Sequence, residues 1–108
     1  MPLTPGDVVT VDFVGATGMK RRPAVVVSSE AYNQDHLDVA LCVLTSNVAS
    51  AKTDFILQDW KAAGLNAPSV FRVYFGMALP SAVKTIGHLS AADWAGVQAC
   101  LKRAVAVS

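Results

Sequence analysis

The sequence predicts a mainly β protein, a small twisted barrel of about six short strands with one helix packed on it. Short apolar and β-branched runs recur along the chain, separated by glycine, proline and small polar residues. The connections between these runs are too short for the helical crossovers that parallel strands need. Only the last part of the chain has the spacing of an amphipathic helix. Together, these three observations favour an antiparallel sheet that ends in a helix.

The composition predicts one domain over residues 1–108. The chain has 108 residues and is 53% hydrophobic, which suffices for one core but not for two. Charged residues make up only 16% of the sequence, a low share for a fully wetted monomer. We therefore expect apolar surface to be buried against a second subunit, most simply in a homodimer.

Targeting and metal-binding signals are missing from the sequence. The N-terminus lacks the pattern of a signal peptide, and no apolar run approaches the ~18 residues of a membrane helix. We therefore expect a soluble, cytoplasmic protein without membrane attachment. Cys42 and Cys100 lie in apolar segments without metal-ligand spacing, so we expect buried free thiols and predict neither a metal nor a cofactor.

Two strands are predicted in the first part of the chain. Residues 7–13 alternate between apolar and polar side chains, as in a half-buried strand. The glycine-containing stretch 15–19 predicts a flexible connection. Val25, Val26 and Val27 then suit a strand buried on both faces. Because Pro23 fits best where that strand begins, Arg22 is expected to be the last loop residue.

The middle of the chain predicts short elements. Residues 28–33 have a serine cap and an asparagine stop, which indicates a single helical turn or a little more. A central apolar strand over 39–44 ends at small polar residues, which places hydroxyl groups at its exit. Residues 52–57 predict a shorter strand. Residues 58–64 predict a short helix or turn that Gly64 closes.

The last third predicts two strands and the helix. Over 70–75, strand alternation places Phe71, Val73 and Phe75 on one face and Arg72 and Tyr74 on the other. Residues 76–80 are expected to be irregular, and 82–88 to form a last strand. A serine cap at 90, with an acid three residues later, begins a helix to about residue 106. Its apolar stripe contains Trp94, Val97, Leu101, Ala104 and Val105.

The basic run Lys20, Arg21 and Arg22 adjoins the buried strand. A guanidinium anchored beside a rigid strand can hold a phosphate or carboxylate in fixed geometry. The alternative is a solvated loop that keeps a hydrophobic hairpin soluble, which these residues alone slightly favour. The net charge of +1 does not indicate a strongly electrostatic nucleic-acid binder, so the local cluster matters more.

Several motifs in register resemble the PemK/MazF family of toxin endoribonucleases. They are Gly6-Asp7-Val8 at a strand start, Arg22-Pro23-Ala24-Val25-Val26-Val27-Ser28, and Leu44-Thr45-Ser46 at the end of the third strand. Ser69-Val70 and Ile86-Gly87-His88-Leu89-Ser90 resemble the family's second half. The likeness covers nearly the whole chain and is weakest between Tyr74 and Lys84. It implies an SH3-like barrel, a homodimer, metal-independent cleavage of single-stranded RNA, and a cognate antitoxin.

The resemblance also implies a catalytic pair. The family's arginine before the strand-two proline matches Arg22, and its threonine at the end of strand three matches Thr45. In metal-free RNA cleavage, the 2′-hydroxyl attacks the phosphorus and usually leaves a 2′,3′-cyclic phosphate. An arginine suits the developing charge, and Thr45 and Ser46 could donate hydrogen bonds to the phosphate. Without the resemblance, a turn-stabilising role for Thr45 is favoured.

The groups that move protons stay open. Arg72 matches an arginine implicated in acid–base work in some relatives, but Tyr74 stands where those relatives have an aspartate. A tyrosine with a pKa near ~10 is a poor base at neutral pH, although it could donate a hydrogen bond or stack on a base. Arg72 and Tyr74 are thus possible catalytic or phosphate-binding residues. Non-catalytic roles are expected for His36 and His88.

Contacts to RNA and to a protein partner are expected around the basic run. Lys20 and Arg21 would guide RNA, with Met19, Tyr74 and Phe75 as candidates for apolar or stacking contacts. Phe75 is at least as well explained by core packing, and Trp60 and Trp94 are expected to be packing residues. A cationic cleft near apolar surface also suits an antitoxin with an acidic, initially disordered C-terminal segment.

Two alternatives to an endoribonuclease toxin remain at this point. One is a toxin similar to CcdB, which shares the barrel but inhibits DNA gyrase through its C-terminal helix. Residues 102–108 do not show the aromatic-glycine ending associated with gyrase poisoning. The other is a degenerate homologue that binds antitoxin or nucleic acid without cleaving, and Tyr74 is its best support.

Overall fold

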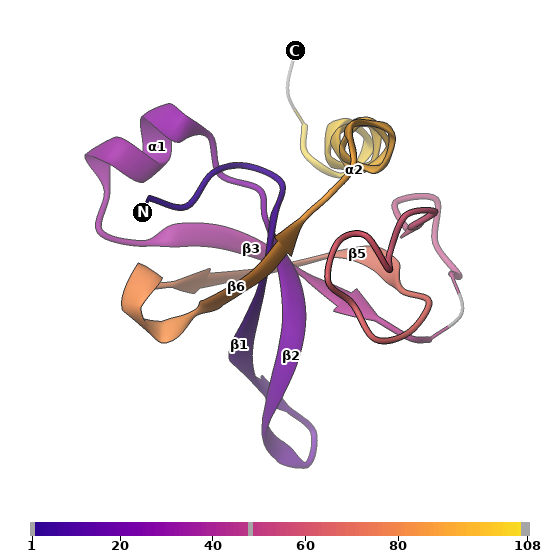
Figure 1. The fold of residues 1–108 in the computed structure, drawn as a ribbon, viewed down its shortest axis with the longest axis horizontal. Helices are drawn as coiled ribbons and strands as arrows, with labels where there is room; N and C mark the ends of the chain where they lie inside the picture. Colours follow the sequence, from indigo (N-terminus) through magenta and orange to yellow (C-terminus); the bar gives the residue numbers. More distant parts are fainter. Residues whose placement is uncertain (1, 48, 107–108) are drawn as a thin grey trace.

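Six antiparallel strands form one curled sheet in the computed structural model, which describes residues 2–47 and 49–106 (Figure 1). In sheet order they are β4 (Phe55–Ile56), β5 (Val70–Ala78), β3 (Val39–Thr45), β2 (Gly18–Val26), β1 (Asp7–Gly15) and β6 (Lys84–His88). The predicted mainly β fold of about six strands with a C-terminal helix is therefore confirmed.

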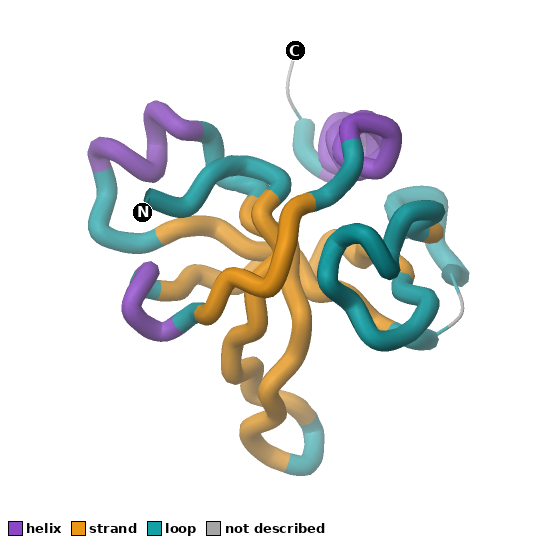
Figure 2. Tube along the Cα trace, viewed as in Figure 1, coloured by secondary structure: helices purple, strands orange, loops and turns teal. Residues whose placement is uncertain are grey.

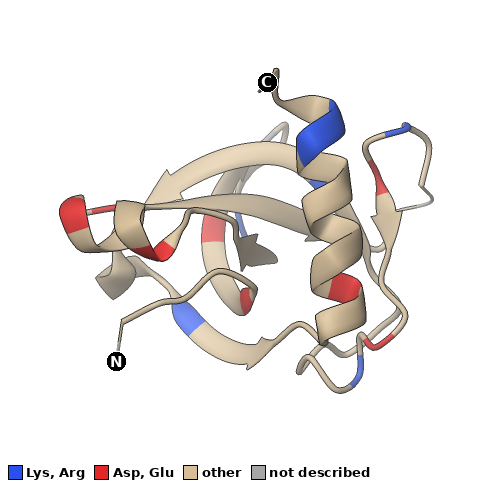
Figure 3. Cartoon of the chain, turned by 90° about the horizontal axis from the view of Figure 1, so that it is seen from above, with Lys and Arg blue, Asp and Glu red and all other residues tan. Residues whose placement is uncertain are grey.

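The helical segments lie around the rim of the sheet (Figure 2). They are α1 (Glu30–Asp35), the 3-10 turn η1 (Pro80–Ala82) and α2 (Ala91–Ala104). Helix α2 contacts β4 and β5 and crosses one side of the curled sheet (Figure 3). Its acid lies in the first turn and its basic residues in the last turn, which suits the helix dipole.

Two apolar clusters cover the two faces of the sheet. The larger one includes Val25, Leu44 and Phe71 with Val97 and Cys100 of α2. The smaller one is formed by Val9, Val11, Ala24, Val26, Val39 and Leu41. The side chains of residues 24–26 alternate between the clusters and are fully buried. The prediction of a strand buried on both faces is therefore confirmed for Val25 and Val26, whereas Val27 lies just past the end of β2 and is partly buried.

Asp93 anchors helix α2 to the chain that follows β4. The Ser90 hydroxyl caps the helix by accepting the Asp93 N–H at 3.1 Å. The buried Asp93 carboxylate accepts the backbone N–H groups of Gln58 (3.0 Å) and Asp59 (2.8 Å). It therefore holds a loop rather than completing a capping box. Trp60 and Trp94 pack against the larger cluster, as predicted.

Cys42 and Cys100 are buried free thiols, as predicted. Burial raises the pKa of the Cys42 thiol to about 12. Within residues 2–47 and 49–106, no cluster of three histidine, cysteine or acidic side chains could hold a metal ion. In the same ranges, the helices are all too short or too polar to cross a membrane.

The expected start of the second strand is wrong. Strand β2 begins at Gly18 rather than Pro23, and Arg22 lies inside the strand rather than at the end of a loop. The glycine-containing stretch is the tip of a long β1–β2 hairpin that pairs from Gly15↔Gly18 to Val8↔Val25. Pro23 is tolerated because β2 pairs with β3 only from Ala24 onward, so at Pro23 it has one neighbour.

Other boundaries also differ from the predictions. Strand β4 is confined to two residues, Phe55 and Ile56, rather than 52–57. The turns over 60–64 agree with the predicted short helix or turn that Gly64 closes. Strand β5 continues to Ala78 because β3 pairs with it as far as Val39↔Ala78. The prediction of irregular chain is therefore wrong for residues 76–78. Helix α1 extends to Asp35, and η1 delays the last strand to Lys84.

Candidate functional site

Arg22 and Thr45 face each other where β2 and β3 separate. The β2–β3 ladder runs from Val26↔Leu41 to Ala24↔Val43 and ends there. The next residue of β2 is Pro23, which has no N–H to continue the ladder. If the same register is extended past Pro23, Arg22 stands opposite Thr45. The proline therefore ends the pairing just before the two predicted catalytic residues.

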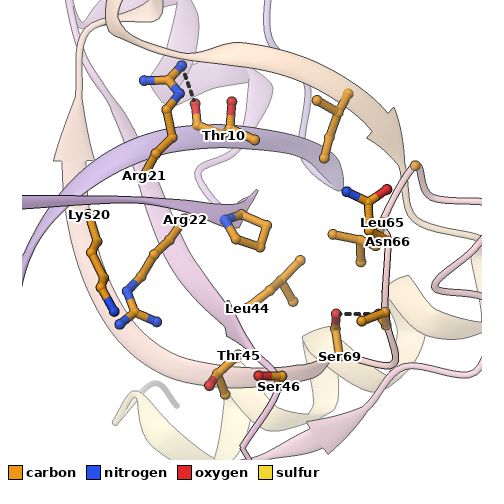
Figure 4. Close-up of a pocket in the computed structure, with 14 residues that line it drawn as sticks. Thr10, Lys20, Arg21, Arg22, Leu44, Thr45, Ser46, Leu65, Asn66 and Ser69 are labelled. Atoms are coloured by element: carbon orange, nitrogen blue, oxygen red, sulfur yellow. Dashed lines mark hydrogen bonds between the residues drawn. The ribbon is translucent and has the colours of Figure 1, made fainter.

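A cleft of about 360 Å³ opens at this separation (Figure 4). The basic end of β2 forms one wall, the end of β3 the floor, and the 64–69 segment the opposite wall. The lining residues are Thr10, Lys20, Arg21, Arg22, Pro23, Leu44, Thr45, Ser46, Gly64, Leu65, Asn66, Ala67, Ser69 and Ile86. We call it the basic cleft.

Alternation along β2 separates the three basic side chains. Lys20 and Arg22 extend in the same direction, towards the end of β3 that carries Thr45 (Figure 4). Within the described ranges, neither side chain makes a hydrogen bond or an ion pair, so their donors are open to an anion. Arg21 instead donates to the Thr10 carbonyl at 3.3 Å and pairs with Asp12 at 3.5 Å. That exposed pair contributes little stability.

Thr45 and Ser46 bring hydroxyl groups to the floor of the basic cleft. Thr45 is 8% exposed, and its Oγ1 accepts the Asn47 N–H at 3.2 Å. This bond within a turn is the one expected if Thr45 only stabilises the turn. Because a hydroxyl also carries a hydrogen, Thr45 can still donate to an anion. Ser46 is exposed beside it.

A second cleft, of about 210 Å³, shares Arg22 and Thr45 with the basic cleft. It is otherwise lined by Phe13, Val14, Val43, Asn47, Arg72 and Tyr74, and we call it the aromatic cleft. The Phe13 and Tyr74 rings are 6.2 Å apart and tilted by 35°, and Tyr74 is 56% exposed. Arg22 and Thr45 thus stand at the junction of a cationic and an aromatic cleft.

A bulge in β5 directs Arg72 and Tyr74 into the aromatic cleft. The β3–β5 register runs Leu44↔Phe71 and then Cys42↔Phe75, so residues 72–74 face one residue of β3. Bulges re-aim side chains in this way. The two side chains share one cleft, as expected from strand alternation, while Phe75 is half-exposed rather than in the core.

Arg72 is bound to a carboxylate that the sequence did not single out. Its Nη2 and Nε donate to Asp54 Oδ2 at 3.1 Å and Oδ1 at 3.4 Å. The Asp54 side chain is 1% exposed, and it also accepts the backbone N–H groups of Ser50 and Ala51. Hydrogen bonding from Arg72 lowers the pKa of the Asp54 carboxyl. The pairing Phe55↔Phe71 places Asp54 opposite Arg72. This contact could be predicted from the sequence only if the pairing of β4 with β5 were already known.

Close backbone contact positions the 64–69 wall, which the sequence also did not single out. A Cβ built on Gly87 of β6 would lie 2.0 Å from the Ala63 carbonyl oxygen. One built on Gly64 would lie 2.2 Å from the Ile86 oxygen, and Gly64 has a φ of +88°. Two glycines in separate segments were the available signal for this approach. The wall brings Asn66 and Ser69 to the basic cleft.

The remaining candidates lie outside both clefts. Met19 is 69% exposed at the tip of the hairpin and lines neither cleft. His88 Nδ1 is 2.8 Å from Asp7 Oδ1, where β1 pairs with the edge strand β6. His36 stacks on Tyr32 beside α1, with ring centroids 4.0 Å apart. Phe75 lines a separate apolar groove beside the C-terminal end of α2.

The two clefts together have the chemistry of a phosphodiester site. A fixed guanidinium and a nearby ammonium suit anionic oxygens, and adjacent hydroxyls can donate to the same group. Aromatic side chains beside them offer surfaces for unstacked bases. Neither lining includes a histidine or a carboxylate of the described residues. The arrangement is therefore suited to holding charge rather than to moving protons through side chains.

Solved structures with this fold match 91–100% of the chain. MazE-MazF (Form-III) from Deinococcus radiodurans is 22% identical, with a TM-score of 0.78 and 100% of each chain covered. A mycobacterial endoribonuclease in complex with its cognate antitoxin is 17% identical, with a TM-score of 0.79, covering 98% of this chain and 97% of that one. Mycobacterium tuberculosis toxin MazF-mt6 is 19% identical, with a TM-score of 0.73, covering 91% and 94%. These likenesses show the fold.

No curated protein sequence matches significantly. The family model of the PemK-like, MazF-like toxin of type II toxin-antitoxin system matches residues 4–105. This match extends across the basic strand, the end of β3, the bulge in β5 and helix α2. The chain therefore belongs to the PemK-like, MazF-like family of type II toxins.

Proposed function

We propose that the protein is an endoribonuclease toxin that cleaves single-stranded RNA, above all mRNA, without a metal ion. The observation that carries the proposal is the opposition of Arg22 and Thr45 at the junction of the two clefts. Family membership supports the toxin role, and a mycobacterial structure with this fold is that of an endoribonuclease. Because mRNA is the proposed substrate, the proposed location is the cytoplasm.

In the proposed reaction, the scissile phosphate lies between Arg22 and Thr45. The ribose 2′-oxygen forms a bond to phosphorus while the bond to the 5′-oxygen breaks, which leaves a 2′,3′-cyclic phosphate and a free 5′-hydroxyl. The guanidinium of Arg22 neutralises the charge that builds on the phosphoryl oxygens, and the Thr45 hydroxyl donates to one of them. Water accepts the 2′ proton and supplies the proton for the leaving oxygen. Preorganised charge is then the main source of rate.

Nucleotides on either side of the phosphate would occupy the two clefts. Lys20 and Arg21 attract the RNA backbone to the basic cleft, where Ser46 adds a donor. Tyr74 offers an exposed ring on which a base can stack in the aromatic cleft. Met19 at the hairpin tip would make an apolar contact outside both clefts. Such uneven surroundings support sequence selectivity.

Two protein partners complete the proposal. The first is a cognate antitoxin with an acidic C-terminal segment, supported by the basic cleft and by the antitoxin complexes of structurally similar proteins. The second is another copy of this chain. Phe75, Met77 and Leu79 are each at least 50% exposed along the end of β5, an apolar surface that suits a homodimer.

The test is cleavage of a long unstructured RNA in EDTA. We expect Arg22→Ala to lower kcat/KM by roughly 10² to 10³ and Thr45→Val by roughly tenfold, because each removes a donor to the developing charge. Lys61→Ala is a matched control for loss of charge, since Lys61 is exposed and lines neither cleft. Full activity of the Arg22→Ala protein would refute the proposed site.

Two other outcomes identify the alternatives. RNA that is bound but never cleaved by the wild type would indicate a degenerate homologue. No effect on RNA together with loss of gyrase supercoiling would indicate a toxin similar to CcdB. Mass spectrometry of the products, which resolves a cyclic phosphate from a linear one, tests the proposed chemistry separately.

A further inference from the structure

The segment between β3 and β4, of which the structure describes 46–47 and 49–54, begins and ends beside adjacent residues of β5. We call these described residues the 46–54 loop. Thr45 pairs with Val70 where β3 ends, and Phe55 pairs with Phe71 where β4 begins. The loop therefore connects the two strands that flank the first residues of β5, with Thr45 at its start and Asp54 at its end. The position of the loop depends on the contacts that hold it there.

Asp54 gathers the loop onto β5. Its Oδ2 accepts the N–H groups of Ser50 at 3.0 Å and Ala51 at 3.1 Å, and the same oxygen accepts Arg72 Nη2 at 3.1 Å. The Asp54 N–H in turn donates to the Ala51 carbonyl at 3.0 Å. A second tie is Arg103 of α2, whose Nε donates to the Lys52 carbonyl at 2.9 Å. A buried carboxylate is stable only with such partners.

We propose that Arg72 is a positioning residue that acts through Asp54. The pair holds the 46–54 loop and thereby sets the Thr45 and Ser46 hydroxyls against Arg22. This inference rests on the proposed function. It excludes Arg72 as a proton donor, because a guanidinium is not deprotonated in proteins. Losing that proton would also leave the buried Asp54 charge without its partner.

The two possible roles of Arg72 predict different results for its partner. If Arg72 positions the loop, Asp54→Asn resembles Arg72→Ala. If Arg72 instead binds the phosphate directly, Asp54→Asn releases the guanidinium and leaves cleavage intact, whereas Arg72→Ala abolishes it. Comparing the two variants therefore separates positioning from direct contact.

The experiment measures kcat and KM for RNA cleavage by Arg72→Ala, Arg72→Lys, Asp54→Asn and the Arg72→Ala/Asp54→Asn double variant. We expect each single variant to lower kcat by roughly 10- to 100-fold with KM nearly unchanged, since small misplacements of reacting groups have effects of this size. The double variant should be no worse than the singles, because both remove one contact. Arg72→Lys should recover part of the rate.

Amide hydrogen exchange without RNA gives a readout that does not depend on cleavage. We expect faster exchange at Ser50 and Ala51 in the Arg72 and Asp54 variants, while exchange at Leu41 and Cys42 stays far slower than at those two residues, which shows that the fold persists. Asp35→Asn is the matched control for the change in charge, since Asp35 is exposed at the end of α1. It should match the wild type in both measurements.

The outcomes distinguish the two proposals. A wild-type protein that cleaves no RNA overturns the proposed function and the positioning role with it. An active wild type whose Asp54→Asn variant cleaves normally leaves the proposed function standing and overturns the positioning role. Unchanged exchange at Ser50 and Ala51 in an Arg72→Ala protein overturns the positioning role as well.

Discussion

At the scale of single residues, neighbouring arginines differ because a strand sends them to different surroundings. Arg21 donates to Thr10 and pairs weakly with Asp12, whereas Arg22 points along the basic cleft. Arg72 is engaged by a buried carboxylate. The three arginines therefore have three different environments. Of the three, only Arg22 has guanidinium N–H groups that are open to a phosphate.

Asp54 should make stability fall in acid. Hydrogen bonds from Arg72 lower its pKa in the folded state, so the contribution is fully present above the unfolded pKa of about 3.9 and is lost as pH falls through the folded pKa. Asp54→Asn should therefore lower the free energy of unfolding at pH 7 by on the order of 1–3 kcal/mol and show a shallower decline below pH 4. Urea unfolding at a series of pH values measures this. Parallel acid profiles for the two proteins would contradict it.

The residue types of the site could be predicted from the sequence, but their partners could not. Arg22, Thr45, Arg72 and Tyr74 all line one of the two clefts. Asp54 was missed because its link to Arg72 depends on the β4–β5 register, and a two-residue strand is too short to show a register. Met19 lies on the hairpin beyond both clefts, so its contact with RNA stays a prediction.

At the scale of elements, two irregularities in regular strands create the site. Pro23 ends the β2–β3 ladder and lets the strands part, and the bulge in β5 turns Arg72 and Tyr74 towards the gap. The sequence showed the apolar runs, and so most strands were predicted. Neither irregularity could be located, because each depends on which strand lies alongside.

Gly87→Ala should test how the wall of the basic cleft is set. An added Cβ would meet the Ala63 carbonyl at 2.0 Å, and backbone cannot move aside as a flexible side chain can. We expect a loss of about 1–3 kcal/mol of stability and weaker RNA binding. Thermal unfolding and fluorescence anisotropy with labelled RNA measure the two effects. Gly18→Ala is the comparison, because a Cβ there meets open space. The Gly18 φ of +110° adds strain in that variant without a clash. Equal RNA affinity in the two variants would argue against the role of the wall.

At the scale of the whole molecule, one sheet carries apolar clusters on both faces and still exposes the end of β5. The low share of charged residues anticipated unburied apolar surface, but it gave no position for it. The structure locates it at Phe75, Met77 and Leu79, and the last two lie in the stretch 76–80 where the sequence predicted irregular chain. Extension of β5 follows from its pairing with β3, a long-range contact that local pattern does not reveal.

This exposed surface predicts self-association. Wild-type protein should sediment at twice the chain mass of 11.3 kDa at micromolar concentration, and Met77→Glu should shift it to the monomer, because a charge would have to be buried in the interface. Leu37→Glu is the control, since Leu37 is 86% exposed in the turn before β3. A monomeric wild type, or an unchanged dimer in Met77→Glu, would contradict the prediction. Sedimentation equilibrium distinguishes these cases.

The parting of β2 from β3 also bears on solubility. From Gly18 to Pro23, β2 pairs with β1 alone in the described part of the sheet, and such an open edge can recruit a strand from another molecule. Lys20, Arg21, Arg22 and Pro23 occupy this edge, and charged residues and proline are what natural sheets use to block that addition. Replacing all the basic residues to abolish cleavage would therefore also expose an aggregation-prone strand edge. A cleavage-deficient toxin made for structural work should keep Lys20 and Arg21 even where Arg22 is replaced.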